Sequence, residues 1–383
     1  MKKEHLYFQD KECGHPNHLR RTRGLVITYQ CNLDCLYCYV SNKSDKQMPL
    51  DVAKQAIADS FVDRSGNSFQ EVEIDFLGAE PLCAFDKIKE IALWMWSQPW
   101  PKPYILFATT NGTLLNEEMK DWFHTHRERF VLGLSYDGDE ETQNVNRSDS
   151  SRQIDLDFFQ KNWPQQPIKM TISEKTVHRL ADGIIFLQEK GFDIHANPAN
   201  GTIPWSEASI AEYSRQLAKL IDYYLDHPEV PRVSLLDVDL KTLLTSRSSF
   251  ENKYCGAGVA FDVVDVDGKE YPCHLFSPLV LSKSKIYALR SLNFHAKEPF
   301  IDPKCKNCVL EHICPTCYGM NYRSTSNPAL REVTLCKLYM LQILANSKLQ
   351  AKILARKQSL SAEDKEIAYV IQTIYQLLNK KTM

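Results

Sequence analysis

The sequence of 383 residues lacks several features that would each point to a particular class of protein. No apolar run reaches the roughly 20 residues that a transmembrane helix needs. The N-terminal segment carries charges but no apolar stretch after them, so it does not have the form of a secretory signal. With 46 Lys and Arg against 48 Asp and Glu, the chain has no basic excess of the kind that nucleic-acid binding requires. The sequence therefore predicts a cytoplasmic protein whose partners are neither membranes nor nucleic acids.

Internal repeats and low-complexity linkers are also missing, and the first half of the chain instead alternates β-type runs with helical patterns. Strands are expected at 24–30, 71–78, 104–112, 130–138, 167–173 and 192–198. Helices are expected at 49–64, 85–96, 115–126, 176–191 and 206–228. This alternation is typical of a parallel sheet with helices outside, either an open doubly wound sheet or a barrel, partial or complete.

Both architectures bind ligands at the carboxyl ends of their strands. Residues suited to chemistry lie at four successive expected strand ends: Cys31, the segment 78–81, Asn111, and the pair Ser135 and Asp137. We therefore expect a site there.

Twelve cysteines are present, and a cytoplasmic chain is not expected to join them as disulfides. Cys31, Cys35 and Cys38 form a Cys-x3-Cys-x2-Cys pattern directly after the first expected strand. A structural zinc site would need four ligands. Three thiolates on one loop suit a [4Fe–4S] cluster with one iron left open for a substrate or cofactor.

This pattern, with Tyr37 before its last cysteine, resembles the radical S-adenosylmethionine (radical SAM) family. The stretch "LGAEP" resembles the family's Gly-Gly-Glu-Pro loop, with Ala79 in place of the second glycine. "TTNGTLL", "LSYDG" and the following "NVNR" resemble the ends of the family's third and fourth strands. The resemblance implies that Cys31, Cys35 and Cys38 hold the catalytic cluster. It implies cofactor contacts from Tyr37, Gly78, Ala79, Glu80, Pro81, Asn111, Ser135 and Arg147.

Seven further cysteines lie between residues 255 and 336. Zinc is one interpretation, but two Cys-x2-Cys pairs separated by five residues are too close for a zinc ribbon, which usually separates them by about 15–20. The pattern resembles the SPASM extension of radical SAM enzymes, although two residues rather than three precede Cys317. The resemblance implies one auxiliary [4Fe–4S] cluster on Cys255, Cys273 and Cys317, and another on Cys305, Cys308, Cys314 and Cys336. The first of these is one cysteine short.

The fold that the resemblance implies is α/β: a partial (β/α)6 TIM barrel, a cysteine-rich α+β SPASM domain and a C-terminal helix. A β-hairpin is expected within 259–273. The expected organisation is an N-terminal extension (1–20), the barrel (21–230), a bridging region (231–249), the SPASM domain (250–340) and a C-terminal helical segment (341–383).

The resemblance implies an enzyme with three [4Fe–4S] clusters and SAM that modifies a peptide or protein. We expect a maturase that forms a thioether or carbon–carbon cross-link in a ribosomally made peptide. The alternative is an anaerobic sulfatase-maturating enzyme, but there an aspartate serves as the base where this chain has His274. A non-catalytic electron carrier is a third hypothesis, which the cofactor loop and Asn111 disfavour. The expected electron donor is a flavodoxin or ferredoxin. Because only 30 residues precede Cys31, the expected reader of a leader peptide is a separate leader-binding protein or the catalytic surface, and the third alternative is a substrate without a leader.

Overall fold

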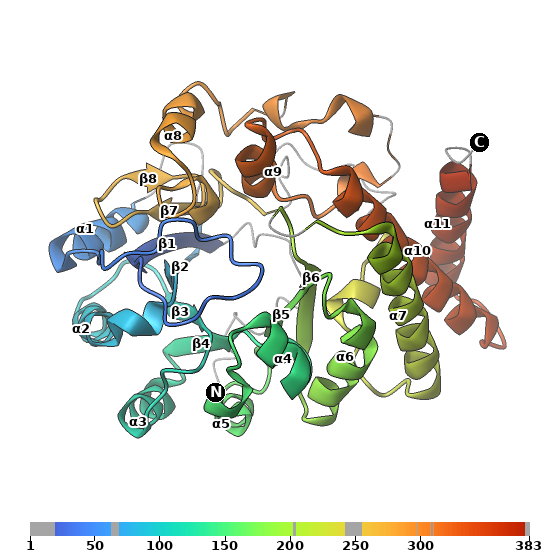
Figure 1. Cartoon of the computed structure of the whole chain (residues 1–383), viewed down its shortest axis with the longest axis horizontal. Helices are drawn as coiled ribbons and strands as arrows, with labels where there is room; N and C mark the ends of the chain where they lie inside the picture. Colours follow the sequence, from blue (N-terminus) through green and yellow to red (C-terminus); the bar gives the residue numbers. More distant parts are fainter. Residues whose placement is uncertain are drawn as a thin grey trace.

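The computed structural model in Figure 1 describes residues 20–62, 69–201, 204–241, 255–296, 298–306, 308 and 310–379. The expected N-terminal extension, apart from its last residue, and positions 242–249 of the expected bridging region lie outside these ranges. Within them, no helix combines the length and hydropathy required to cross a bilayer.

The strands form a mixed α/β fold dominated by parallel pairing. The first six strands are β1 (Arg20–Thr28), β2 (Glu71–Gly78), β3 (Tyr104–Thr110), β4 (Phe130–Leu134), β5 (Ile168–Ile172) and β6 (Ile194–Pro198). The first four lie side by side in chain order, and β5 pairs with β6. A parallel bridge between Ser135 and Lys169 continues the order from β4 to β5. All six predicted strands are therefore present, each within a few residues of its expected bounds.

Helices lie along the outer side of these strands (Figure 1). They are α1 (Leu50–Ser60), α2 (Phe85–Trp96), α3 (Glu117–His126), α4 (Glu140–Asn146), α5 (Leu156–Asn162), α6 (Leu180–Glu189) and α7 (Glu207–Asp226). The period-two pattern of β2 explains the packing: Val72, Ile74 and Phe76 are fully buried in the core that these helices share. The alternate acids Glu73 and Asp75 consequently point to the opposite, enclosed face of the sheet.

The predicted hairpin is present but extends the N-terminal sheet. It consists of β7 (Phe261–Val264) and β8 (Glu270–Tyr271), and its turn contains Gly268 with a φ of 82°. β7 pairs in parallel with β1, so the sheet order is β4-β3-β2-β1-β7-β8. Arg23 of β1, fully buried, forms ion pairs of 2.9 Å with both Asp262 and Glu270. The first and seventh strands are thus joined by charges as well as by backbone pairing.

The remaining helices are α8 (Lys283–Leu289), α9 (Tyr318–Thr325), α10 (Val333–Ala355) and α11 (Ala362–Asn379). α10 packs along α7, where Lys352 forms an ion pair of 3.2 Å with Asp222. The C-terminal segment, expected as one helix, forms two. Ser361 and Asp364 exchange hydrogen bonds of 3.0 and 3.1 Å in a capping box, which starts α11.

Candidate active site

The three N-terminal cysteines lie in one loop beyond the end of β1. All three are partly buried, and the backbone N–H of Cys38 donates to the carbonyl of Cys35 at 3.0 Å. The N–H of Leu36 donates to the carbonyl of Asn146, at the end of α4, over 2.9 Å. The loop is therefore anchored to the segment that follows β4.

The environment of these thiols is protected from solvent. Burial raises the pKa of Cys35 to about 11, Arg147 acts in the opposite direction, and the charges of Cys38 and Cys31 raise it further. Among the described residues, no group of three or more His, Cys, Asp or Glu side chains is arranged to hold a single metal ion. A [4Fe–4S] cluster is a larger body that takes one thiolate per ligated iron. Three partly buried thiols on one anchored loop fit such a group.

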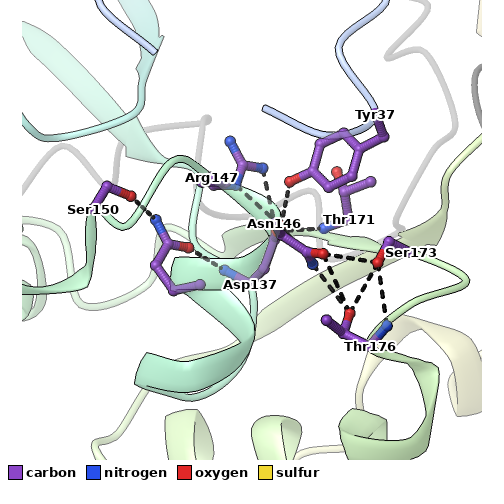
Figure 2. Close-up of polar contacts among 9 residues, drawn as sticks. Tyr37, Asp137, Asn146, Arg147, Ser150, Thr171, Ser173 and Thr176 are labelled. Atoms are coloured by element: carbon purple, nitrogen blue, oxygen red, sulfur yellow. Dashed lines mark hydrogen bonds and ion pairs between the residues drawn. The ribbon is translucent and has the colours of Figure 1, made fainter. Parts of the chain in front are cut away.

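Asp137 connects this loop to the end of β4 (Figure 2). Its carboxylate is completely buried and accepts a hydrogen bond from the hydroxyl of Tyr37. Arg147 forms an ion pair with it, with Nε at 3.1 Å and Nη2 at 3.2 Å. The backbone N–H of Thr171 and the side-chain amide of Asn146 donate at 2.8 and 3.2 Å. One carboxylate thus fixes a residue of the cysteine loop and the arginine expected to contact SAM.

A second layer of hydrogen bonds holds Asp137 in place (Figure 2). The backbone N–H of Asp137 donates to Gln143 at 2.9 Å, and Gln143 donates to Ser150 at 2.9 Å. Ser173 donates to the side-chain oxygen of Asn146 at 2.7 Å. Because most of these groups are buried, the geometry around the Asp137 carboxylate is set before any ligand binds.

Glu80 connects the end of β2 to the end of β3, as Asp137 connects the cysteine loop to the end of β4. Its side chain is 2% exposed and accepts hydrogen bonds from the Leu82 N–H (3.0 Å), the Thr110 hydroxyl (2.7 Å) and the Asn111 N–H (2.8 Å). Burial raises the pKa of Glu80, while these three donors favour the carboxylate. Since its oxygens are occupied by the protein, Glu80 shapes the loop that carries it.

Gly78 is required by a close approach between backbones. A Cβ atom added here would lie 2.5 Å from the carbonyl oxygen of Thr28. The N–H of Ala79 donates to that same oxygen at 3.2 Å, and Pro81 begins a short 3₁₀ turn. The β2 loop is consequently pressed against the end of β1, beside the cysteines.

Asn111 and Ser135 lie at the ends of β3 and β4. The Asn111 side chain donates to Asn32, inside the cysteine loop, at 3.0 Å and accepts from the Thr113 N–H at 3.0 Å. The N–H of Ser135 donates to the Thr110 carbonyl at 2.9 Å. The structure therefore brings the predicted residues of four strand ends to one edge of the sheet.

The C-terminal cysteines fall into two spatial groups. In the first, Cys273 is 7% exposed, and burial together with the charges of Cys317 and Cys255 raises its pKa. Cys255 is exposed to solvent. The thiols expected to share the first auxiliary cluster thus lie close enough to perturb one another.

The second group lines a single cavity of about 470 Å³. Its cysteines are Cys305, Cys308, Cys314 and Cys336. Burial raises the pKa of Cys314 to about 11; Arg331 opposes the rise, and the other three cysteines add to it. Arg331 also lines the cavity, whose wall is completed by residues of β6, α10 and α11. A donor set of four thiols around one space fits a [4Fe–4S] cluster.

Tyr39 and His274 lie between the loop of Cys31, Cys35 and Cys38 and the first C-terminal group, with their ring centroids 5.5 Å apart. Tyr39 is 36% exposed, and partial desolvation followed by the charges of Cys38, Cys273 and Cys317 raises its pKa, which places this side chain among both sets of thiols. Burial lowers the pKa of His274 to about 4, with a further contribution from Lys169.

Sequence reasoning did not single out the charged residues of the enclosed face. Burial raises the pKa of Asp75 to about 7, Lys169 opposes the rise and Glu73 adds to it. The Lys169 ammonium donates to Thr109 at 2.8 Å. The alternation of acidic and apolar residues along β2 was the available signal, because strands of a parallel sheet are usually apolar on both faces. Arg331 belongs to no motif that would have identified it.

Comparison with known proteins gives partial sequence matches, and no family model matches the chain. A cysteine-type anaerobic sulfatase-maturating enzyme of Clostridium perfringens is 25% identical over 327 residues, which cover 74% of this chain and 84% of that enzyme. An uncharacterised protein of Methanocaldococcus jannaschii is 35% identical over 115 residues. That second match spans 30% of this chain and only 37% of the relative.

Two solved structures share the fold. Native anSMEcpe with bound AdoMet and the Cp18Cys peptide has a TM-score of 0.65 at 18% identity, covering 88% of this chain and 100% of that one. SuiB of Streptococcus suis bound to the precursor peptide SuiA has a TM-score of 0.56 at 17% identity, covering 83% of this chain and 76% of that one. Both similarities extend beyond the six strands β1 to β6.

Proposed function

We propose that this chain, a radical SAM/SPASM enzyme related to sulfatase-maturating enzymes and peptide maturases, oxidatively forms a thioether or carbon–carbon cross-link in a ribosomally made peptide. Bound SAM and a [4Fe–4S] cluster would supply a 5′-deoxyadenosyl radical that removes a hydrogen atom from this substrate. The chain's own task is to bind, orient and shield the reacting groups.

The observation that carries this proposal is the shared contact of Tyr37 and Arg147 with Asp137. It joins the loop of Cys31, Cys35 and Cys38 to a side chain suited to a carboxylate ligand. Arg147 is 8% exposed and uses Nε and Nη2 for Asp137, which directs its remaining nitrogen, Nη1, toward other partners. In this proposal that nitrogen meets the carboxylate of SAM, and the loop of Gly78, Ala79, Glu80 and Pro81 meets its amino group, with Asn111 and Ser135 contributing at the neighbouring strand ends.

Two auxiliary [4Fe–4S] clusters belong to the same proposal. Cys255, Cys273 and Cys317 would hold the first, and Cys305, Cys308, Cys314 and Cys336 the second. The partial (β/α)6 barrel formed by β1 to β6 would surround the substrate, and the cysteine-rich region would close its open side. A flavodoxin or ferredoxin would supply electrons, and a separate protein would present the leader of the peptide.

A second candidate function is the conversion of a Cys or Ser side chain to formylglycine. It is favoured by the match to the sulfatase-maturating enzyme over 74% of this chain. The residue after Cys273 is His274, where that group of enzymes is expected to have an aspartate. Burial lowers the pKa of His274 to about 4, so the imidazole is neutral near pH 7 but is a weaker base than an unperturbed histidine.

Three assays separate these functions. Anaerobically reconstituted protein is incubated with SAM and a reductant, and formation of 5′-deoxyadenosine distinguishes an enzyme from an electron carrier. Candidate peptides encoded nearby are then added and analysed by mass spectrometry. Loss of two hydrogens without an aldehyde supports a cross-link, whereas a product that reacts with a hydrazide probe supports formylglycine. Absence of 5′-deoxyadenosine in iron-loaded protein would refute both enzymatic functions.

A further inference from the structure

The guanidinium of Arg331 contacts one of the four thiols of the C-terminal cavity. Its Nη1 donates a hydrogen bond to Sγ of Cys314 over 2.8 Å, and the side chain lines the same cavity as all four cysteines. Arg331 precedes α10 and lies outside every motif used to propose the cluster sites. The pattern of proposed ligands therefore does not explain why Arg331 lies beside Cys314.

The contact is held by a buried carboxylate. Asp302, 4% exposed, accepts the backbone N–H of Arg331 at 3.1 Å through one oxygen and the N–H of Lys304 at 2.9 Å through the other. The carbonyl of Asp302 accepts the N–H of Cys305 at 2.8 Å. Asp302 therefore holds both the turn that contains Cys305 and the backbone of Arg331.

The charge of Arg331 interacts with three of the four thiols, Cys314, Cys305 and Cys336. Burial of the guanidinium disfavours its charged form, but Cys314, Cys305 and Cys336 together raise the pKa of Arg331 above its usual value. An arginine remains protonated in proteins, so this side chain brings a permanent positive charge into the cavity wall. At partly buried sites such a charge acts more strongly than it would in water.

We propose that Arg331 is a positioning residue that raises the reduction potential of the cluster on Cys305, Cys308, Cys314 and Cys336. Reduction adds one negative charge to the cluster, and a hydrogen bond to sulfur and a nearby cation both stabilise the more negative state. This inference rests on the proposed cluster site. It goes beyond the proposed function because it assigns control of this cluster's reduction potential to a residue that is not one of the proposed ligands.

A purely structural role for Arg331 predicts something different. If the guanidinium only fills the space between the turn at Cys305 and the start of α10, its removal would lower stability or iron content and leave the potential of the loaded cluster unchanged. The reduction potential is therefore the measurement that separates the two roles.

The test uses the full chain, reconstituted anaerobically and titrated with a reductant while reduced clusters are followed by electron paramagnetic resonance. The C-terminal cluster is identified as the signal that disappears in Cys336→Ala. Arg331→Gln removes the charge and Arg331→Lys keeps a charge without the planar fork. Lys352→Gln, on α10 and paired with Asp222, removes one charge away from the cysteines and serves as the control.

We expect Arg331→Gln to retain the parent's iron content and to shift the midpoint potential of this signal to more negative values. Arg331→Lys should lie between that variant and the parent, and Lys352→Gln should match the parent. An exchangeable proton coupled to the reduced cluster, detected by electron–nuclear double resonance, is expected in the parent. An unchanged potential, or loss of the cluster from Arg331→Gln, would overturn the proposal. A parent protein without this signal would instead refute the cluster site on which it rests.

Discussion

Tyr37 donates a hydrogen bond to Asp137, which lies 100 residues further along the chain. Tyr37 lies between Cys35 and Cys38, and Asp137 follows β4. Because Asp137 also holds Arg147, the loop cannot shift without disturbing the arginine. The site therefore responds as one unit to changes at Asp137, and this coupling is open to experiment.

Asp137→Asn should destabilise the fold and impair SAM cleavage together. The substitution leaves the buried Arg147 guanidinium without its counter-charge, which costs about 3–5 kcal/mol of unfolding free energy. Anaerobic urea unfolding and 5′-deoxyadenosine formation measure the two effects. Asp139→Asn is the control: it keeps a good N-cap for α4 and loses only a partly exposed ion pair, worth about 0–1 kcal/mol. Equal behaviour of both variants would contradict a special role for Asp137.

Changing Cys31, Cys35 and Cys38 together to alanine should abolish 5′-deoxyadenosine formation and leave the C-terminal clusters in place. Three [4Fe–4S] clusters contain about twelve irons per chain, so the variant should retain about eight. Iron analysis and the cleavage assay test this directly. Residual cleavage would refute the assignment of the catalytic cluster, and about four irons with stoichiometric zinc in the parent would mean that the C-terminal cysteines bind zinc.

Gly78→Ala should lower both stability and SAM cleavage, because the new Cβ would meet the Thr28 carbonyl at 2.5 Å. Forcing apart two packed backbones costs about 1–3 kcal/mol, by analogy with overpacked cores. Ala79→Gly, which introduces the second glycine of the family loop, is the matched control and should cost at most about 1 kcal/mol. Thermal melting of both variants compares these costs, and a fully stable Gly78→Ala would show that the strand ends separate easily.

Cys273→Ala should retain SAM cleavage and lose the modified peptide. A substrate radical that becomes a cross-link must give up a second electron, and the first auxiliary cluster is the proposed acceptor. The expected signature is 5′-deoxyadenosine without product, measured together with iron content and melting temperature. Product formation at the parent rate by a folded variant would refute an acceptor role for this cluster.

Asp75→Asn should change how stability depends on pH. The folded-state pKa of Asp75, raised to about 7 from 3.8, means that ionising this carboxyl opposes folding. The loss of stability caused by ionising Asp75 is absent below about pH 4, grows as the pH rises, and is complete above about pH 7. The variant should therefore gain melting temperature over the parent at pH 8 and not at pH 4. Lys169 and Glu73 face the same carboxyl, so an equal difference at both pH values would indicate that Lys169 already neutralises Asp75.

The local pattern of the sequence predicted most elements of the first half of the chain. The bounds of β2 and α2 match the expected 71–78 and 85–96 because alternation and helical spacing are properties of the segments themselves. The two seven-residue helices α4 and α5 were missed, since so few turns give little periodicity. The pairing of β7 with β1 was not predicted either, because a contact between strands more than 230 residues apart leaves no mark in either segment.

The site residues also divide into those that the sequence predicted and those that it did not. Cysteine spacing and the strand-end residues could be found from the sequence, because they recur at positions fixed by the architecture. Lys169 could not, because it acts through space on Asp75, which is distant in the chain, and Arg331 could not, because it lies outside the cysteine pattern. Asp137 was noted only as a strand-end residue, and its contacts with Tyr37 and Arg147 emerge from the folded structure.

The parallel pairing of β7 with β1 also has a consequence for how the protein is made. On the ribosome, β1 emerges early, but the strand that covers its free edge is synthesised more than 230 residues later. At about 5–20 residues per second this delay lasts roughly 10–50 s. During this delay, β1 has a row of unpaired backbone N–H and C=O groups along one edge. Such an edge readily pairs with a strand of a neighbouring chain. Arg23 lies on this strand and becomes buried against Asp262 and Glu270 only when β7 and β8 have been made.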